Sequence, residues 1–365
     1  MGAPTIKQIA DAANVSTATV SLALRNHPRI SKKTAQRIQD LAKTMGYHPN
    51  PLVVALMSHV RMTTQAPPST TLGFINAYPE RDPRKVSPSF ALNFKGASER
   101  ADQLGYRLDV FWTREPGMTA RRLSNVLLAR GIPGILVGPL PRGRGHLSLT
   151  WSKFAASSIG YSMWRPHLHR ATSHHAHAIL LALRKLQRMG YRRIGLAMSP
   201  NFDERVDHHW LANFLLSKHG LDQKYEVPVL IDDTDNMQEF PKWFATHRPD
   251  AIISPHQSAY DWLMRLKVNV PGEVGFVHLD LDPQVMKFSG INQRPELIGA
   301  AAVDLLINQL NQNERGIPED PKLLLIESVW VEGFSTRKLL VERDEPSEKV
   351  PRKTRPRSLK KVPVQ

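Results

Sequence analysis

The sequence predicts an all-α headpiece followed by a larger α/β core. Residues 1–48 contain three short segments of helical spacing, each bounded by residues that begin or end helices. From residue 72 to about residue 336, apolar strand-like runs alternate with helical ones. This alternation is typical of parallel sheets covered by helices on both faces, and the region is long enough for two such sheets.

The composition restricts the class of protein. The chain has 365 residues, a formal net charge of +16 and an isoelectric point near 10.1. This excess of positive charge favours a polyanionic partner, nucleic acid before an acidic membrane surface. The chain contains no cysteine, which excludes disulfides and thiolate zinc sites. Because there is no export signal and no apolar run near the roughly 20 residues of a membrane helix, we expect a cytoplasmic protein with no membrane partner.

Capping chemistry defines the three helices of the headpiece. The residues expected to begin or end them are Thr5 with Gln8 (a capping box), Asn14, Ser16, Ser31 and Gly46. Two short helices joined by a tight turn and braced by a third make a helix-turn-helix. Residues 1–62 carry eight Lys and Arg against two Asp, a net charge of +6. We therefore expect this unit to bind DNA.

The headpiece resembles that of a known family. Residues 5–50, TIKQIADAANVSTATVSLALRNHPRISKKTAQRIQDLAKTMGYHPN, are similar to the DNA-binding domain of the LacI/GalR family of bacterial transcription regulators. The matching elements are I-x-x-I-A-x-x-A at 6–13, V-S-x-x-T-V-S at 15–21, R-I-S at 29–31 and G-Y-x-P-N at 46–50. The resemblance implies a homodimer on a double-stranded DNA operator of pseudo-palindromic sequence, with one recognition helix in each major-groove half-site. It also implies a bacterial, nucleoid-associated location.

Position by position, the resemblance implies a set of DNA-binding residues. Bases would face Thr17, Ala18 and Ser21 on the second helix. Phosphates or the adjacent turn would be held by Thr5, Ser16, Thr19, Asn26, Ser31, Thr34, Tyr47 and Asn50. Leu22 stands where many family members carry an arginine suited to guanine. The bases read there therefore differ, or are read through a thymine methyl group.

The segment after the headpiece predicts a hinge helix. Asn50 suits its N-cap and Pro51 its first helical position. So short and apolar a helix is unstable alone in water, and we expect it to form against the partner's hinge and the DNA, with packing on the core as the alternative. The resemblance assigns Leu56 to a leucine that the family inserts between base pairs in the minor groove. Val53-Val54 replaces the family's Ala-Arg, which removes a phosphate-contacting cation.

Five regions follow from these observations. They are a helix-turn-helix domain (1–48), a hinge helix (49–61), a linker (62–71), an effector-binding and dimerisation core (72–336) and a basic disordered tail (337–365). The linker is rich in Pro, Ser and Thr without periodicity. The last 15 residues hold six Lys and Arg and no acid, so the tail is either a solvated extension or a non-specific phosphate contact.

The core resembles the family's regulatory region, a relative of periplasmic sugar-binding proteins. In that fold two α/β lobes hold a small molecule between them, and the chain would cross between lobes near residues 170, 293 and 328. Ligands of such sheets bind at the carboxyl ends of the strands. The candidate effector-binding residues are Ala77, Tyr78, Phe90, Tyr161, Trp164, Arg205, His256 and Asp280.

The resemblance supports Arg205 and Asp280 most directly, because the family often places an arginine and an aspartate on the effector at these points. Each could instead serve the structure, as a surface ion pair or a turn cap. Pro255-His256 and Ser173-His174 replace Asn-Asp and Asp-Asn pairs that often grip sugar hydroxyls. A sugar is therefore one candidate effector, and a pocket without ligand response is the alternative.

Other functional classes fit less well. The chain has no G-x-S-x-G, no phosphate-binding G-x-x-x-x-G-K-[ST] and no H-E-x-x-H, so we expect no enzyme and no cofactor. Histidines cluster between residues 167 and 177, but metal binding needs converging ligands, and we expect no metal site. A transport binding protein would need export, and a structural nucleoid protein would not need the core. The sequence thus predicts a dimeric, effector-modulated repressor.

Overall fold

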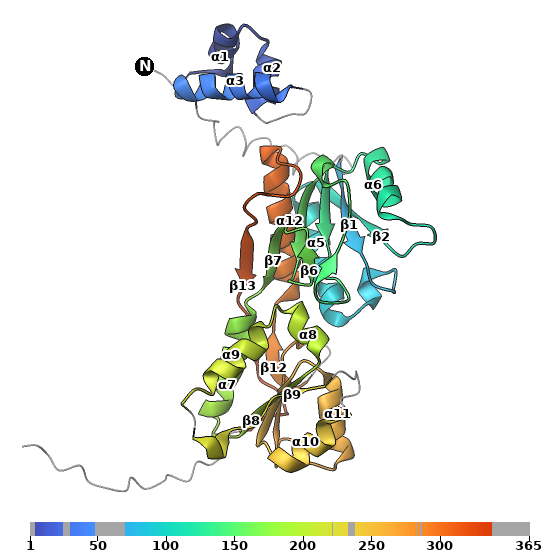
Figure 1. Cartoon of the computed structure of the whole chain (residues 1–365), viewed down its shortest axis with the longest axis vertical. Helices are drawn as coiled ribbons and strands as arrows, with labels where there is room; N and C mark the ends of the chain where they lie inside the picture. Colours follow the sequence, from blue (N-terminus) through green and yellow to red (C-terminus); the bar gives the residue numbers. More distant parts are fainter. Residues whose placement is uncertain are drawn as a thin grey trace, which may run out of the picture.

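The computed structural model describes residues 4–24, 30–47, 70–220, 222–232, 238–282, 284 and 287–337. Figure 1 shows a small helical headpiece and a core of two lobes that follow one another along the long axis. The structure confirms the predicted fold class, a helix-turn-helix unit plus a two-lobed α/β core.

The headpiece consists of α1 (Ile6–Ala13), α2 (Thr17–Leu24) and α3 (Lys32–Thr44). The predicted capping box is confirmed, since the Thr5 hydroxyl accepts from the Gln8 amide and the Gln8 side chain accepts from the Thr5 amide. Asn14 ends α1 in the left-handed conformation at φ 53°. The buried residues of the three helices form one small core: Ile9, Ala10, Ala13, Val20, Ala23, Ala35, Ile38 and Ala42.

Lobe 1 is built on a parallel six-stranded sheet of order β13-β7-β5-β3-β1-β2. Its strands are β1 (Thr70–Asn76), β2 (Tyr106–Trp112), β3 (Gly134–Val137), β5 (Ala155–Ile159), β7 (His169–Ser173) and β13 (Leu323–Ile326). Its helices are η1 (Pro83–Lys85), α5 (Pro88–Gln103), α6 (Ala120–Ala129), η2 (Trp151–Lys153) and α12 (Pro295–Gln312). A small ribbon of β4 (Gly145–His146) and β6 (Met163–Arg165) is attached to it.

Lobe 2 is built on a second six-stranded sheet, of order β14-β12-β11-β10-β8-β9, in which only β14 runs antiparallel to its neighbour. Its strands are β8 (Ile194–Met198), β9 (Leu230–Ile231), β10 (Ala251–Ser254), β11 (Gly275–His278), β12 (Ser289–Asn292) and β14 (Val329–Val331). Its helices are α7 (His175–Arg188), α8 (Pro200–Arg205), α9 (His209–Ser217), η3 (Gln223–Tyr225), α10 (Phe240–His247) and α11 (Gln257–Arg265).

Alternate residues of the central strands pack on opposite faces of each sheet. In lobe 1, Phe74 packs toward α5 and α12, whereas its neighbour Ile75 packs toward α6. In lobe 2, Ile253 packs toward α7 and α9, and Ile252 packs toward α10 and α11. Strands that are apolar on both sides therefore lie between two helical layers, as their near-continuous hydrophobic runs predicted.

The chain passes between the lobes three times: from β7 to α7, from β12 to α12 and from β13 to β14. These passages confirm the crossovers predicted near residues 170, 293 and 328. Two details differ from what the sequence suggests. The run RVDHHWLANFLLSKHG at 205–220 has helical spacing, but α8 ends at Arg205 and α9 begins only at His209, because Asp207 and His208 adopt the left-handed conformation. Strand β1 begins at Thr70, inside the segment predicted as a linker.

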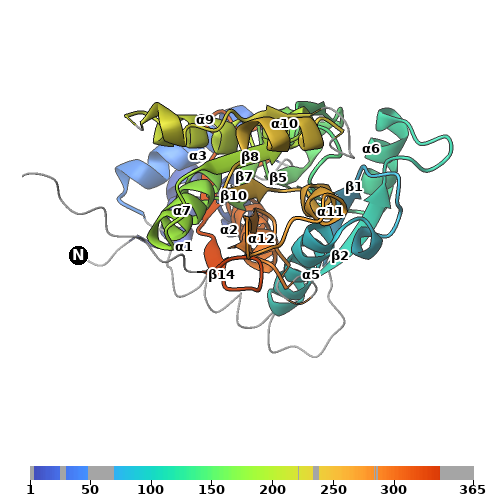
Figure 2. The same ribbon diagram turned by 90° about the horizontal axis from the view of Figure 1, so that it is seen from below.

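Helices α5 and α12 lie side by side on one face of lobe 1 (Figures 1 and 2) because two glycines let their backbones touch. A Cβ on Gly96 would lie 2.0 Å from the Glu296 carbonyl oxygen, and a Cβ on Gly299 would lie 2.0 Å from the Asn93 carbonyl oxygen. No side chain can be accommodated at such distances without moving one helix. An ion pair between Arg100 and Asp304, at 2.7 Å, closes the solvent side of this contact.

We expect Gly299→Ala to lower the free energy of unfolding by about 2 kcal/mol, because the strain of overpacking exceeds the gain in helix propensity. Urea unfolding followed by circular dichroism measures the change. The matched control is Asn308→Ala, an exposed position of the same helix, which should stay within about 0.5 kcal/mol of the parent. Equal stability of Gly299→Ala and the parent would contradict the close helix contact.

Candidate functional site

The second helix of the headpiece presents the side chains predicted to read bases. Thr17 and Ala18 are exposed on α2, and Ser21 and Leu22 are partly exposed there. The residues predicted to hold phosphates lie mainly at helix ends, where their hydroxyl groups also act as caps. The predicted residues Asn26, Asn50, Val53 and Leu56 lie outside the described residues, as does the whole hinge segment 49–61.

The capping hydroxyls are paired within the headpiece. The Ser16 hydroxyl accepts from the Thr19 amide at 3.1 Å and lies 2.9 Å from the Thr19 hydroxyl. Ser31 and Thr34 repeat this arrangement at 3.2 Å and 2.8 Å. Tyr47 packs on the headpiece core. These groups therefore fix the helix ends, and DNA contact by them would be additional.

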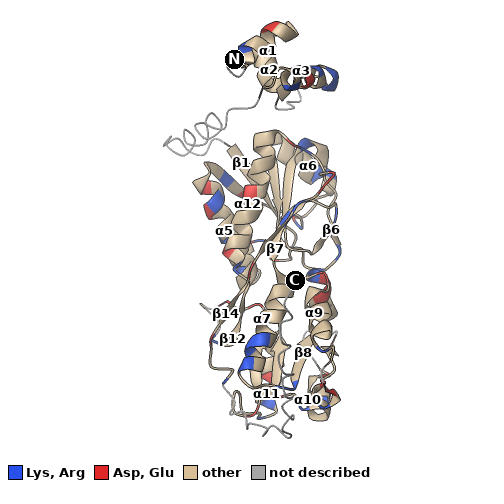
Figure 3. Cartoon of the chain, turned by 90° about the vertical axis from the view of Figure 1, so that its left-hand side faces the viewer, with Lys and Arg blue, Asp and Glu red and all other residues tan. Residues whose placement is uncertain are grey.

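Positive charge gathers on α3. Four of its side chains, Lys32, Lys33, Arg37 and Lys43, are exposed cations, against one acid, Asp40. They are the blue positions of this helix in Figure 3. Lys and Arg side chains of this kind bind DNA phosphates whatever the base sequence, while other side chains read the bases.

The core contains a cavity of about 390 Å³ lined by both lobes. Its walls come from the carboxyl ends of the strands and the first turns of α5, α7, α11 and α12, with α8 and the start of α9 beside them. Six of the eight predicted effector residues line it: Tyr78, Phe90, Tyr161, Arg205, His256 and Asp280. Its volume falls in the range typical of small-molecule sites.

The other two predicted residues lie outside this lining. Ala77 packs against the α6 side of the lobe 1 core, and its carbonyl oxygen accepts a hydrogen bond of 3.0 Å from Arg114. Trp164 lies on β6 with 43% of its surface exposed, and the Arg144 guanidinium stands 5.8 Å above its ring. Both are one or two residues from a lining residue. The expectation that ligands bind at the carboxyl ends of strands therefore located the region but not the direction in which each side chain points.

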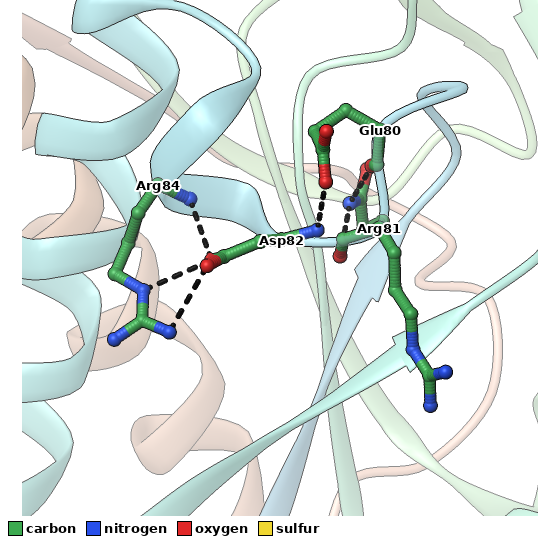
Figure 4. Close-up of polar contacts among 5 residues, drawn as sticks. Glu80, Arg81, Asp82 and Arg84 are labelled. Carbon is green, nitrogen blue, oxygen red and sulfur yellow. Dashed lines mark hydrogen bonds and ion pairs between the residues drawn. The ribbon is translucent and has the colours of Figure 1, made fainter.

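A fully buried asparagine shapes the loop that brings Tyr78 to the cavity. The Asn76 amide group donates to the carbonyl oxygens of Glu80 and Arg81, at 2.8 and 3.0 Å, and its oxygen accepts from the Tyr78 amide at 2.9 Å. Beyond this, Asp82 caps η1 and pairs with Arg84 at 2.9 Å (Figure 4). One side chain thus organises the whole turn after β1.

The charged groups of the cavity are an arginine and an aspartate that do not pair with each other. Arg205 makes no hydrogen bond or ion pair with any described residue, and its guanidinium lies 5.4 Å from the Phe202 ring centre. Asp280 accepts a hydrogen bond of 2.8 Å from the Ser89 hydroxyl of the opposite lobe. Burial raises the pKa of the Asp280 carboxyl, while Ser89 and Arg205 act in the other direction. The unpaired guanidinium is a donor available to a polar ligand.

Burial keeps two of the cavity histidines neutral. Burial lowers the pKa of His175 to about 3 and that of His278 to about 4. His256 accepts a hydrogen bond of 3.1 Å from the Ser199 amide through Nε2, so its other ring nitrogen carries the proton. These imidazoles therefore offer hydrogen bonds without adding charge, and Arg205 is the cation of the lining.

Sequence reasoning missed several lining residues. Asn93, His175 and Trp210 line the cavity, and each has one buried polar atom without a hydrogen-bond partner in the described part of the chain. Buried polar atoms are usually paired, so these three mark a polar wall. They lie inside helices rather than at strand ends, and only His175, the first residue of α7, could have been found from its place after a strand.

Two negative findings concern the described residues alone. No group of three His, Asp or Glu side chains within them converges on a point where a metal ion could bind. No described helix is both long and apolar enough to cross a membrane.

Comparison with known proteins agrees with the two parts of the fold. Residues 5–50 match the family described as bacterial regulatory proteins, lacI family, and residues 183–336 match the periplasmic binding protein-like domain. The regulator NtdR of Bacillus subtilis (strain 168) is 33% identical over 137 residues, 38% of this chain and 37% of NtdR. The repressor CytR of Escherichia coli (strain K12) is 25% identical over 334 residues, 86% of this chain and 92% of CytR. The chain thus spans little more than a third of NtdR, and 35% of another relative, DegA of Bacillus subtilis.

Solved structures share the fold at low sequence identity. The regulator CelR in complex with cellobiose is 17% identical with a TM-score of 0.55, covering 91% of this chain and 99% of CelR. The lac repressor dimer bound to operator and the anti-inducer ONPF is also 17% identical, with a TM-score of 0.54 over 92% of this chain and 100% of that one.

The chain thus joins a helix-turn-helix headpiece to a two-lobed, periplasmic-binding-protein-like core with a cavity between the lobes. Within that architecture, residues 5–50 form a helix-turn-helix domain that matches the lacI family, and the similar proteins NtdR and CytR are regulators.

The lowered pKa of His278 predicts acid sensitivity. The unfolded chain, with a histidine pKa of 6.5, binds more protons than the folded chain between pH 6.5 and about 4, so stability falls as the pH is lowered through this window. His278→Asn keeps an acceptor for the Asp280 amide but cannot be protonated. We expect the parent to lose about 2 kcal/mol more than this variant between pH 7 and pH 5.

Urea unfolding at the two pH values measures this difference. The raised pKa of Asp280 has the opposite sign and is present in both proteins, so the comparison isolates His278. The matched control is His219→Asn, the same substitution at an exposed position. Identical pH profiles for the parent and His278→Asn would show that burial does not hold this imidazole neutral.

Proposed function

We propose that the chain is a homodimeric, sequence-specific repressor of the cytoplasm whose affinity for its operator is set by a small molecule bound between the two lobes. The observation that carries this proposal is the cavity itself, which receives side chains from both lobes and holds the unpaired Arg205 guanidinium. A ligand in contact with both lobes would bind their possible arrangements with different affinities, and linkage then changes operator affinity reciprocally.

The names of similar proteins and the ligands in similar structures support this proposal. CytR is a repressor, CelR was solved with cellobiose, and a regulator from Enterococcus faecium with a TM-score of 0.55 was solved with ribose. We therefore propose a sugar as the first effector to test. The cavity offers one cation, one carboxyl and neutral imidazoles, a mixture suited to a polyhydroxylated molecule.

DNA recognition is proposed to combine contacts in the major groove with contacts in the minor groove. Thr17, Ala18, Ser21 and Leu22 would contact bases from the major groove, while capping hydroxyls and the cations of α3 contact phosphates. The hinge would enter the minor groove with Leu56 as its wedge and Val53 packed on its partner. The operator is proposed to be pseudo-palindromic, matching a two-fold dimer.

Leu56→Ala tests the wedge on an operator selected from random duplexes. Without the leucine we expect less bending and an affinity for the selected operator lower by roughly tenfold or more, because no side chain is then inserted between the unstacked base pairs. Förster resonance energy transfer between dyes at the two duplex ends measures bending, and fluorescence anisotropy measures affinity. Leu52→Ala is the control in the same segment. Unchanged bending and affinity would refute the wedge, and failure to select any preferred sequence would favour a non-specific nucleoid role.

Arg205→Ala tests the effector site. Thermal melting of the parent is measured with cellobiose, ribose and libraries of nucleosides and organic acids; a ligand at 100 times its Kd stabilises the folded state by about 2.7 kcal/mol. We expect the shift to disappear in Arg205→Ala and to persist in Arg144→Ala, which alters an arginine outside the cavity lining. Equal shifts in both variants would place the effector elsewhere, and no shift with any compound would support a cavity that has lost ligand response.

A further inference from the structure

The loop after β3 is a fixed arm of lobe 1. The Leu140 amide donates to the Ser162 hydroxyl at 2.7 Å, and the Gly145 amide donates to the Ser162 carbonyl oxygen at 2.7 Å. Ser162 is only 2% exposed. Two short hydrogen bonds to one buried residue therefore hold the arm, residues 139–145, in place on its own lobe, and Pro139 at its start lines the cavity.

Helix α8 of lobe 2 meets this arm. The Asn201 side chain accepts from the Gly143 amide at 3.3 Å and donates to the Pro141 carbonyl oxygen at 3.4 Å. A single amide group thus engages both a donor and an acceptor of the opposite lobe's backbone. Asn201 itself is exposed, so its substitution does not disturb a core.

The arm approaches α8 so closely that its contact residue has no room for a side chain. A Cβ added to Gly143 would lie 2.4 Å from the Glu204 Cβ and 3.0 Å from the Glu204 carbonyl carbon. The φ angle of Gly143 is not in the left-handed region, so the requirement is one of space across the cleft. A larger residue there would separate the arm from α8.

The same short helix carries the unpaired cation of the cavity. Asn201 and Arg205 are four residues apart in α8 and so lie on the same side of it. A second contact between the lobes, Ser89 with Asp280 at 2.8 Å, lies inside the cavity itself. The groups that would meet a ligand are therefore directly next to groups that already join the lobes.

We propose that the Asn201 side chain is a clasp that holds the two lobes together in the absence of a ligand. The clasp requires glycine at position 143, because a side chain there would clash with Glu204. This deepens the proposed function, on which its regulatory meaning rests. A ligand on Arg205 would act on the helix that forms the clasp, and so would strengthen or release it. The lobes are then partly closed before any ligand binds, and the effector adjusts an existing equilibrium.

The chain contains no cysteine, so two spin labels can be attached to introduced cysteines without replacing any native one. Leu128→Cys on α6 and Met264→Cys on α11 alter exposed positions of opposite lobes. Figure 1 shows α6 and α11 on the same side of the core. Pulsed electron paramagnetic resonance between spin labels then reports the distance between the lobes of the full-length protein, without DNA or effector.

Asn201→Ala should shift this distance distribution toward longer values, with the open-to-closed ratio raised roughly fivefold or more by the loss of the two hydrogen bonds that Asn201 makes to the arm. Arg142→Ala is the matched control, an exposed residue of the same arm for which the structure gives no hydrogen bond or ion pair with any described residue, and should leave the distribution unchanged. Gly143→Val should shift it further, with a melting curve confirming that the variant folds.

The proposal is overturned if Asn201→Ala leaves the distribution of the parent unchanged, or if Arg142→Ala shifts it equally. This readout involves no ligand, so the clasp and the proposed effector function can fail separately. A shift in Asn201→Ala together with no thermal response to any compound would support the clasp and contradict the effector site. The reverse pattern would support the effector site alone.

Discussion

The contact between α5 and α12 through Gly96 and Gly299 is the constraint on which the arrangement of lobe 1 depends. These two helices cover one face of the sheet, and their first turns deliver Ser89, Phe90 and Pro295 to the cavity. Helix α12 begins directly after the chain leaves lobe 2. The distance between the two helices therefore determines where this wall of the cavity lies and where the chain enters lobe 1 from lobe 2.

Local chemistry explains why the headpiece could be predicted almost completely. Thr5 with Gln8, Asn14 and Ser31 act on backbone groups within three or four residues, so the signal and its effect lie in the same short stretch. Strands with continuous apolar residues, such as β10, were also evident. The crossovers followed from the family resemblance, and the resemblance together with the strand ends located six cavity residues.

Long-range packing explains what sequence reasoning did not find. Strand β5 lies in the middle of its sheet and is entirely buried, yet it reads AASSI. Ser157 is stable there because α12 lies directly on the strand: its hydroxyl donates to the Ala302 carbonyl oxygen at 2.8 Å, and the Gln309 side chain bonds both the amide and the carbonyl of the neighbouring Ala156. The partners are about 150 residues away in sequence. For the same reason Asn93 and Trp210 could not be assigned to the cavity.

The three passages between lobes have a consequence for synthesis on the ribosome, where chains emerge from the N-terminus. The headpiece is complete once α3 has emerged, long before either lobe is. Lobe 1 begins at Thr70 but must wait for α12 to cover its sheet and for β13 to close its edge, while lobe 2 waits for β14. Both lobes therefore finish within a few residues of each other, at Ile326 and Val331, and a nascent chain holds its folded helix-turn-helix well before its two-lobed core is complete.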